Sequence, residues 1–360
     1  MSETLVIALG GNAITRPGEP GTIPQQFEHT AETLGHLVPL FRSDAKIVIT
    51  HGNGPQIGNI LIRSEEGERR VPRLPLDTCV SDSQGGMGYM IQRILFELFR
   101  REGIQRTAAT VITQVLVSEG DPDMVHPTKP IGRFYTSAEM EELRLDRPHW
   151  VLGEIEPGRW RRVVASPRPL RIMEEAAIAC LLHAGVVVIA CGGGGIPVAW
   201  EGDRLVGVEG VVDKDRASSL LARHLHAQKL IIVTSVDRAA IRFGRPDQQW
   251  LDTVTVAQAR AYLAAGEFPA GSMGPKMEAA IEFVEGGGQE CIITCTEHVA
   301  PAISGERGAR PLDSVLPQTR SLTLGALTGA PAVREGLRRT AQLQTVGDLG
   351  THAGTHIVAS

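Results

Sequence analysis

The 360-residue chain has 42% hydrophobic and 21% charged residues and a formal net charge of −5, a balance typical of soluble globular proteins. The negative charge gives no general reason to bind nucleic acid or an anionic membrane, and no apolar run approaches the roughly 20 residues of a membrane-spanning helix. The five cysteines form no CxxC pair, so we expect free thiols in a reducing cytoplasm and no metal bound at Cys291 or Cys295.

Apolar, strand-like runs alternate with helical patterns along most of the chain. Strands are predicted at residues 5–9, 45–50, 186–190, 230–234 and 290–294, and helices at 25–41, 86–102, 172–184, 215–226, 256–265 and 276–285. This alternation predicts an α/β fold with a mainly parallel sheet, covered by helices on both faces. Ligands of such sheets bind at the carboxyl ends of the strands, where the glycine-rich turns of this chain fall.

Two stretches interrupt the alternation. Residues 119–162 are rich in Pro, Asp, Glu, Arg and Trp and show no clear order of strands and helices, so we interpret them as an inserted subdomain or lid. Residues 300–350 form a second irregular region, with a loose helical pattern near 332–343. It is predicted to be a surface helix or a partly disordered insertion.

Glycine-rich loops follow the first two predicted strands. Gly10, Gly11 and Asn12 come directly after the first, and Gly52-Asn53-Gly54 after the second. Such loops let successive backbone N–H groups point at an anion, and the asparagines add side-chain amides. His51 could act as a base, but a histidine at a strand end more often bonds to backbone.

Two further segments are expected near the same edge of the sheet. The run Gly192–Gly195 follows the strand at 186–190, and four successive glycines are favoured where a ligand comes too close for a Cβ. Ser83 and Gln84, followed by two glycines, look like a helix start that either exposes N–H groups to a ligand or serves only as a cap.

Lysine is scarce, because 31 of the 36 basic residues are arginines and only five are lysines. Lys46 and Lys229 precede apolar runs and are expected at strand entrances on the surface. Lys129, Lys214 and Lys276 lie in glycine-, proline- or aspartate-containing loops, where a compact ammonium group differs in use from a forked guanidinium. Three such point charges suit phosphoryl transfer.

The flanks of Lys214 are acidic, since Asp213 precedes it and Asp215 follows it. One interpretation is a helix N-terminus with acidic caps. The other assigns Lys214 to the transferred phosphoryl group, with Asp213 orienting the lysines. A carboxylate or phosphate nucleophile is already charged and needs no base.

Two later segments predict a nucleotide pocket. Residues 234–237 and 243–246 have the pattern of an adenine and ribose pocket, and the turn at 271–276 could hold β- and γ-phosphates through Lys276. The chain contains neither the Walker pattern nor a GxGxxG motif after the first strand, and it lacks the HRD and DFG motifs of protein kinases.

Taken in order, these segments resemble the carbamate kinases of the amino acid kinase family, from about residue 4 to residue 300. The resemblance rests on the segments Ala8–Ala13, Thr50–Gln56, Ser83–Gly85 with Gly88–Met90, Pro127–Gly132, Ser166–Pro167, Ile189–Pro197, Gly207–Glu209 with Asp213–Asp215, Val236–Asp237 and Pro269–Lys276.

The resemblance implies a three-layer α/β/α sandwich with a small protruding subdomain at 119–162, a single domain over 1–360, and a homodimer. It implies reversible phosphoryl transfer between ATP and carbamate, giving ADP and carbamoyl phosphate, with Mg²⁺ carried by the ATP phosphates. Residues 1–200 would bind carbamate and the phosphoryl group, and residues 201–300 would bind the nucleotide.

The same resemblance implies roles for individual residues. Lys129 and Lys214 would stabilise the transition state, Asp213 would organise the lysines, and Lys276 would contact the nucleotide phosphates. The expected contacts of carbamate and the phosphoryl group are Gly10, Gly11, Asn12, Gly52, Asn53, Gly54, Ser83, Gln84, Gly193 and Gly194. The expected contacts of the nucleotide are Thr234, Val236, Asp237, Ser272, Met273, Gly274 and Lys276.

The chain departs from the family pattern at three places. Arg133 stands where the family usually has proline, the lead-in Val80–Ser83 differs, and 300–350 looks inserted, since 354–358 resembles the usual family ending. These changes leave the phosphoryl-transfer residues intact but leave the acceptor open. The alternatives are a kinase for another small carboxylate, phosphate or phosphonate, and a non-catalytic nucleotide-binding sensor.

Overall fold

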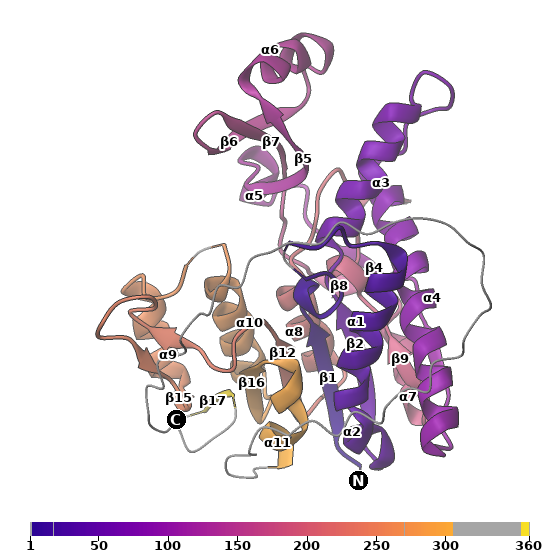
Figure 1. Cartoon of the computed structure of the whole chain (residues 1–360), viewed down its shortest axis with the longest axis vertical. Helices are drawn as coiled ribbons and strands as arrows, with labels where there is room; N and C mark the ends of the chain where they lie inside the picture. Colours follow the sequence, from indigo (N-terminus) through magenta and orange to yellow (C-terminus); the bar gives the residue numbers. More distant parts are fainter. Residues whose placement is uncertain (1, 17, 270, 305–353, 360) are drawn as a thin grey trace, which may run out of the picture.

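The computed structural model describes residues 2–16, 18–269, 271–304 and 354–359 (Figure 1). Its main sheet has the strand order β15-β17-β16-β12-β1-β2-β9-β3. The bounds are β1 (Thr4–Leu9), β2 (Lys46–His51), β3 (Ala108–Thr110), β9 (Val187–Ile189), β12 (Lys229–Val233), β15 (Thr253–Thr255), β16 (Glu290–Thr294) and β17 (Thr355–Val358). Neighbouring strands run parallel except β16 and β17, which are antiparallel.

Helices cover both faces of this sheet, which confirms the predicted three-layer α/β/α sandwich. One face carries α1 (Ile23–His36), α2 (Val38–Arg42), α4 (Leu76–Glu102) and α11 (Val299–Ser304). The other carries α7 (Glu175–His183), α8 (Lys214–His224), α9 (Val256–Ala264) and α10 (Met273–Glu285). Successive side chains of a strand point to opposite faces, so Leu230 packs in one core and Ile231 in the other.

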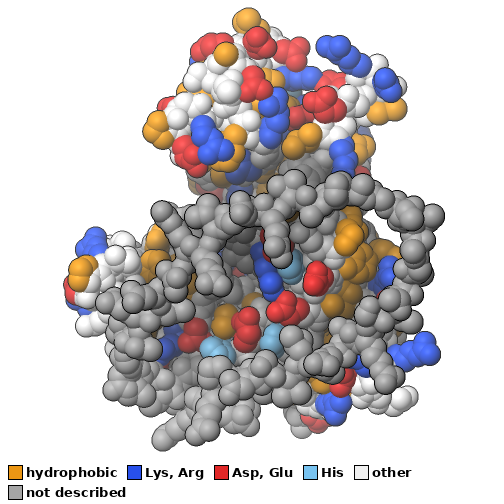
Figure 2. Space-filling model, viewed as in Figure 1, with side chains coloured by type: hydrophobic (Ala, Val, Ile, Leu, Met, Phe, Trp, Pro, Cys, Tyr) orange, Lys and Arg blue, Asp and Glu red, His pale blue; other side chains and the backbone are white. Residues whose placement is uncertain are grey.

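A small subdomain projects from this body (Figure 1). It contains the antiparallel sheet of β5 (Lys129–Thr136), β6 (Val151–Glu156) and β7 (Arg159–Val164), with α6 (Ser137–Asp146). At its base, Ile131 and Val164 share a buried cluster with Ile57 and Leu61 of α3 (Gly54–Gly67). On the face seen in Figure 2, acidic and basic side chains of the subdomain are intermixed.

A second sheet has the order β11-β10-β4-β8, and a short pair joins β13 to β14. Their bounds are β4 (Gln114–Leu116), β8 (Arg171–Ile172), β10 (Ile196–Glu201), β11 (Arg204–Gly207), β13 (Ala240–Ile241) and β14 (Gln249–Trp250), and α5 spans Pro122–Val125. Among the helices that the structure describes, none combines the length and apolar character of a membrane span.

The five predicted strands of the sheet are confirmed to within one residue at either end. The helix predicted at 25–41 is instead two helices, because α1 ends at His36 and α2 begins at Val38 with Pro39 in its first turn. Residues 119–162, expected to show no regular order, contain β5, α6 and β6 and most of β7, and α3 was not predicted.

The helix predicted at 86–102 begins ten residues earlier, at Leu76. The interpretation of Ser83 and Gln84 as a helix start is therefore wrong, since both lie inside α4. The two exposed glycines Gly85 and Gly86 were misleading, because glycine is common at helix ends but here lies inside a helix. Packing explains the glycine at position 88, because a Cβ there would lie 2.3 Å from the Thr110 side chain.

Of the irregular region predicted at 300–350, only residues 300–304 are described, and they belong to α11. The pattern near 332–343 lies outside the described residues. Residues 355–358, expected to resemble the family ending, form β17 between β15 and β16. The boundaries 119–162, 1–200 and 201–300 stay predictions.

Removing a buried side chain from the central strand β12 should destabilise the whole body. Leu230 is fully buried, at 0% exposure, so Leu230→Ala should lower the free energy of unfolding by about 2–5 kcal/mol. Urea denaturation followed by circular dichroism measures this change. Leu145→Ala on α6, where the side chain is 87% exposed, is the control and should stay within about 0.5 kcal/mol of wild type. Equal losses in both variants would contradict the described packing.

Candidate active site

A cleft of about 800 Å³ lies at the carboxyl ends of β1, β2 and β9, next to the projecting subdomain. The predicted residues that line it are Gly10, Gly11, Gly52, Asn53, Gly54, Lys129, Gly193, Asp213, Lys214 and Lys276. Segments that are up to 266 residues apart in the sequence thus meet at one edge of the sheet, as expected for a doubly wound fold.

The glycine loops lie against one another as well as against the cleft. Gly193 and Gly194 have φ angles of +66° and +96°. A Cβ at Gly194 would lie 2.2 Å from the carbonyl oxygen of Val212, and one at Gly193 would lie 2.1 Å from the Asn53 amide nitrogen. The sequence analysis explained the glycines at 192–195 by the close approach of a ligand. The packing of one loop against another is already enough to require glycine at positions 193 and 194.

Ser83 and Gln84 are buried behind the cleft and are absent from its lining. The Asn53 side-chain amide donates to Ser83 Oγ at 2.8 Å. Gln84 Nε2 donates to the carbonyl oxygens of Thr113 and Gly192, both at 3.1 Å. The two side chains therefore hold the loops after β2 and β9 in place, and direct contact with a substrate stays a prediction. Asn12 lies in the short 3₁₀ turn η1 (Gly11–Ala13).

The three predicted lysines converge on two carboxylates. Lys129 Nζ lies 3.0 Å from Asp213 Oδ2. Lys214 Nζ lies 2.9 Å from Asp215 Oδ1, and Lys276 Nζ lies 2.9 Å from Asp215 Oδ2. Each lysine comes from a different element, namely β5, α8 and α10.

Asp215 is the residue that the sequence analysis missed. Asp213 was expected to organise all the lysines, but the carboxylate that bridges Lys214 and Lys276 is Asp215. The available signal was its position directly after Lys214, where one interpretation was acidic capping of a helix and the other gave Asp215 no role. The residue that caps α8 is Asp213. Its Oδ1 accepts from the backbone N–H groups of Asp215 at 2.9 Å and Arg216 at 3.3 Å.

Both carboxylates are held in their ionised form. Burial raises the pKa of Asp215, but the ammonium groups of Lys214 and Lys276 outweigh it and bring that pKa to about 2. Burial also opposes ionisation of Asp213, and Lys129 shifts its pKa below the usual value. Burial, assisted by Lys276, lowers the pKa of Lys214 against the opposing effect of Asp215.

The cleft lining therefore carries four cationic side chains, the three lysines and Arg161, against the three carboxylates of Glu19, Asp213 and Asp215, which leaves positive charge for an anionic ligand. Lys214 also donates to the carbonyl oxygen of Leu9, at 3.2 Å, which fixes its ammonium beside the loop after β1. Arg161 lines the same cleft and donates to the carbonyl oxygen of Gly132 at 2.8 Å. As one arginine among 31, it gave no signal in the sequence.

A second cavity, of about 240 Å³, adjoins the first through the shared residue Lys276. Five of the predicted nucleotide contacts line it: Thr234, Val236, Ser272, Met273 and Lys276. The rings of Phe243 and Phe268 add flat apolar surface that suits an aromatic base.

Two predicted nucleotide contacts are placed elsewhere. Gly274 is buried in the first turn of α10, and its N–H donates to the carbonyl oxygen of Pro269 at 2.9 Å. Asp237 pairs with Arg238, with Nε 3.2 Å from Oδ2, and with His298, with Nδ1 2.5 Å from Oδ1. Neither is in the lining of the 240 Å³ cavity.

Arg133, the departure from the family pattern after Gly132, turns away from the cleft. Its Nη1 lies 2.7 Å from Glu139 Oε1, and its guanidinium lies 4.4 Å from the centre of the Tyr135 ring. The substitution is therefore accommodated within the subdomain and adds no charge to the lining of the 800 Å³ cleft.

His51 bonds to backbone, as the sequence analysis favoured. Its Nδ1 lies 3.1 Å from the carbonyl oxygen of Gly52. Burial lowers the pKa of His51 to about 4, with a smaller contribution from Lys214. The ring is therefore neutral at pH 7 and packs beneath the loop that follows β9.

Comparison with known proteins identifies the relatives of this chain. Residues 3–295 match the amino acid kinase family. The carbamate kinase-like protein YahI of Escherichia coli K12 is 44% identical over 86% of this chain and 98% of its own length. The carbamate kinase of Pyrococcus horikoshii is 41% identical over 86% of this chain and 99% of its own.

A solved structure is similar as well. The carbamate kinase of Giardia lamblia bound to AMP-PNP superposes with a TM-score of 0.80 at 38% identity, covering 84% of this chain and 96% of that one.

The buried His51 should make stability depend on pH. Its folded pKa of about 4 lies below the ordinary value of 6.5, so between these values the unfolded chain binds more protons than the folded one. Lowering the pH from 6.5 to 4 should therefore remove about 3 kcal/mol through this residue. Urea denaturation at several pH values measures the slope.

His51→Gln should flatten this pH dependence, whereas His149→Gln at an exposed position should keep the wild-type slope. Identical slopes in wild type and His51→Gln would show that the ring is free to ionise in the folded protein.

Proposed function

We propose that this chain, which belongs to the amino acid kinase family, is a phosphotransferase that moves a phosphoryl group reversibly between ATP and carbamate. The observation that carries the proposal is the convergence of Lys129, Lys214 and Lys276 on one cleft at the carboxyl ends of the strands. Relatives named carbamate kinase, 40–44% identical over most of the chain, support carbamate as the acceptor.

The lysines would act by electrostatics. A phosphoryl group in transfer carries its negative charge on equatorial oxygens, and catalysis consists mainly of positioning and of compensating that charge. Lys214 and Lys129 would face the group in transfer, and Lys276 lies where the two cavities meet. Asp213 and Asp215 would hold the ammonium groups in place, since an anionic acceptor needs no base.

The loops would position the acceptor. In the proposal, backbone N–H groups at Gly10, Gly11 and Gly193 bind oxygens of carbamate and the phosphoryl group. The Gly52 N–H already donates to the carbonyl oxygen of Leu9 at 3.0 Å, so Gly52 would shape the loop. Ser83 and Gln84 would act behind them as positioning residues, through their bonds to Asn53 and Gly192. Lys129 belongs to the projecting subdomain, so the set is complete only while that subdomain lies against the body.

ATP or ADP would occupy the 240 Å³ cavity, with the base near Phe243 and Phe268 and the phosphates toward Lys276. The Giardia relative with AMP-PNP supports nucleotide binding in this fold. Mg²⁺ would be held through the phosphate oxygens, because both oxygens of Asp215 already contact lysines, and those of Asp213 contact Lys129 and backbone N–H groups. Its chemistry would be to neutralise charge on those phosphates.

Three further features belong to the proposal. We propose a homodimer, a cytoplasmic location, and a role in the breakdown of arginine or purine nitrogen, with flux toward ATP. A second candidate is a kinase for another small carboxylate, phosphate or phosphonate. Arg161 favours it, because that guanidinium in the cleft lining could bind an anion larger than carbamate.

ATP formation from MgADP and carbamoyl phosphate tests the main proposal. In a coupled assay the purified protein should turn over above roughly 10 per second. Lys214→Ala should lower kcat by about 10³-fold through loss of transition-state charge compensation, with ADP affinity nearly unchanged. Lys46→Ala, outside both cavities, is the control and should behave like wild type.

Absence of ATP formation, with ADP binding intact, would refute carbamate and direct the search to other small anions. Turnover of Lys214→Ala near the wild-type rate would refute the role assigned to that lysine.

The requirement for a lysine, rather than any cation, is tested separately at position 129. A guanidinium is larger, flat and forked, so Lys129→Arg should not reproduce the contact with Asp213 and should lower kcat by about 10²-fold. Lys46→Arg is the matched substitution outside the site. If Lys129→Arg keeps wild-type turnover in the same assay, a point charge is not needed there.

A further inference from the structure

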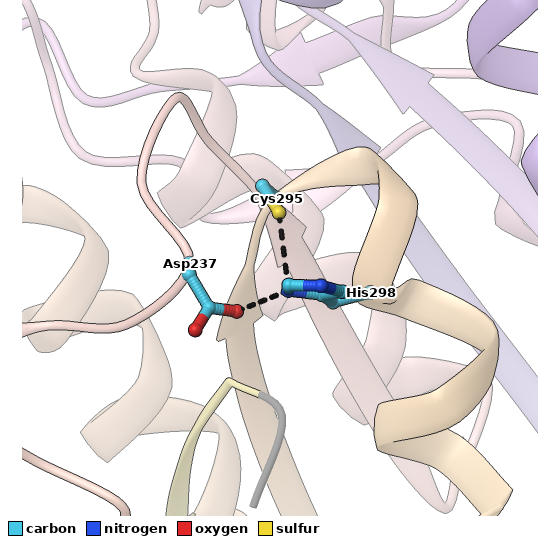
Figure 3. A group of neighbouring side chains, drawn as sticks. All are labelled: Asp237, Cys295 and His298. Carbon is cyan, nitrogen blue, oxygen red and sulfur yellow. Dashed lines mark hydrogen bonds and ion pairs between the residues drawn. The ribbon is translucent and has the colours of Figure 1, made fainter. Parts of the chain in front are cut away.

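Three side chains that could bind a metal come together beyond the ends of two neighbouring strands, outside the 800 Å³ cleft (Figure 3). β12 and β16 pair in parallel, with Val233 opposite Thr294. Asp237 lies in the loop after β12. Cys295 directly follows β16, and His298 ends the short turn η3 (Thr296–His298). Two buried strands therefore fix the bases from which these side chains extend.

The ligand atoms of Asp237, Cys295 and His298 all lie within 4.8 Å of one another. Cys295 Sγ is 3.5 Å and Asp237 Oδ1 is 2.5 Å from the same atom, Nδ1 of His298. In a catalytic relay the nucleophile and the carboxylate contact opposite ring nitrogens. Here a single nitrogen faces both, and it cannot donate to the carboxylate and accept from the thiol at once.

A metal ion between the three side chains would bind all three atoms. For Zn²⁺, bonds of about 2.3 Å to sulfur and 2.0–2.1 Å to nitrogen, at a tetrahedral angle, separate the two atoms by about 3.5 Å. The observed Sγ–Nδ1 distance is 3.5 Å. Nδ1 and Oδ1 would have to move apart from 2.5 Å, and both side chains are about one-third exposed, at 36% and 35%, so they have room.

We propose that Asp237, Cys295 and His298 form a binding site for one borderline-soft divalent transition metal ion of the Zn²⁺ class. Thiolate and imidazole ligands favour such ions, whereas Mg²⁺ takes oxygen ligands. Binding ionises the thiol and releases its proton to solvent, and it requires the neutral His298 tautomer with its proton on Nε2, with no change of oxidation state. Three protein ligands leave further coordination positions for water or a small ligand.

The surroundings of Asp237 support this assignment. Its second oxygen, Oδ2, is 3.2 Å from Arg238 Nε, and Arg238 Nη1 is 2.6 Å from Asp252 Oδ1. Ligating carboxylates are commonly oriented by such outer partners, and Asp252 offsets the charge that the guanidinium brings near a cation.

The proposed metal site lies next to the 240 Å³ cavity. Thr234, Ser235, Val236 and Arg238 line the 240 Å³ cavity, so an ion at Asp237 would tie that loop to η3. The inference does not depend on which anion accepts the phosphoryl group.

Metal binding by the full-length protein tests the proposal. After treatment with a chelator, Zn²⁺ is titrated calorimetrically in the presence of excess Mg²⁺, and Co²⁺ is used as a spectroscopic probe. One equivalent of Zn²⁺ should bind, and Co²⁺ should give thiolate-to-metal charge-transfer absorption. Loss of an outer-shell partner alone costs about 10–100-fold in affinity, so Cys295→Ser and His298→Gln should each weaken Zn²⁺ binding by more than about 100-fold.

Cys180→Ser is the matched control, since Cys180 is the exposed cysteine and Cys79, Cys191 and Cys291 are buried. It should retain both the absorption and the affinity, and thermal melting should show that each variant is folded. The proposal is overturned if the wild type binds no Zn²⁺ beside excess Mg²⁺, or if the charge-transfer absorption persists in Cys295→Ser.

Discussion

The arrangement of the site depends on compensating like charges in a confined space. Lys129, Lys214 and Lys276 would repel one another in an 800 Å³ cleft without their carboxylate partners. Asp213 pairs with the first of them, and Asp215 bridges the other two. Since the lysines come from β5, α8 and α10, these ion pairs also join the projecting subdomain to the two helices of the body. Replacing either aspartate by a neutral residue would therefore alter both the charge and the geometry of the cleft.

The sheet makes this concentration of charge possible. The first turn of α8 supplies both carboxylates and one lysine, and it lies beside the loop after β1 because Lys214 bonds to Leu9. The loops after β2 and β9 are held from behind by buried amides, with Gln84 bonded to the backbone of the glycine run. Backbone N–H groups and ammonium groups are thus fixed before a ligand arrives, which is the condition for electrostatic stabilisation of a transferring group.

The 240 Å³ cavity has a different character. It carries aromatic rings and shares Lys276 with the charged cleft, so it combines apolar surface with one ammonium group. Asp237, expected in that cavity, instead pairs with His298 and Arg238. The loop after β12 therefore has two sides, one toward the cavity and one toward the cluster with Cys295.

The sequence by itself determined the α/β class, the five strands, the glycine loops and the three lysines that line the cleft, because these follow from apolar periodicity, turn residues and the scarcity of one residue type. The tertiary structure decided which side chains contact one another. It placed Asp215 between two lysines, moved Ser83 and Gln84 from a supposed helix start into the middle of α4, brought Arg161 to the cleft, and turned Arg133 toward Glu139. Ion pairs, close approaches of backbone and the direction of a side chain depend on residues distant in the chain, and no local pattern records them.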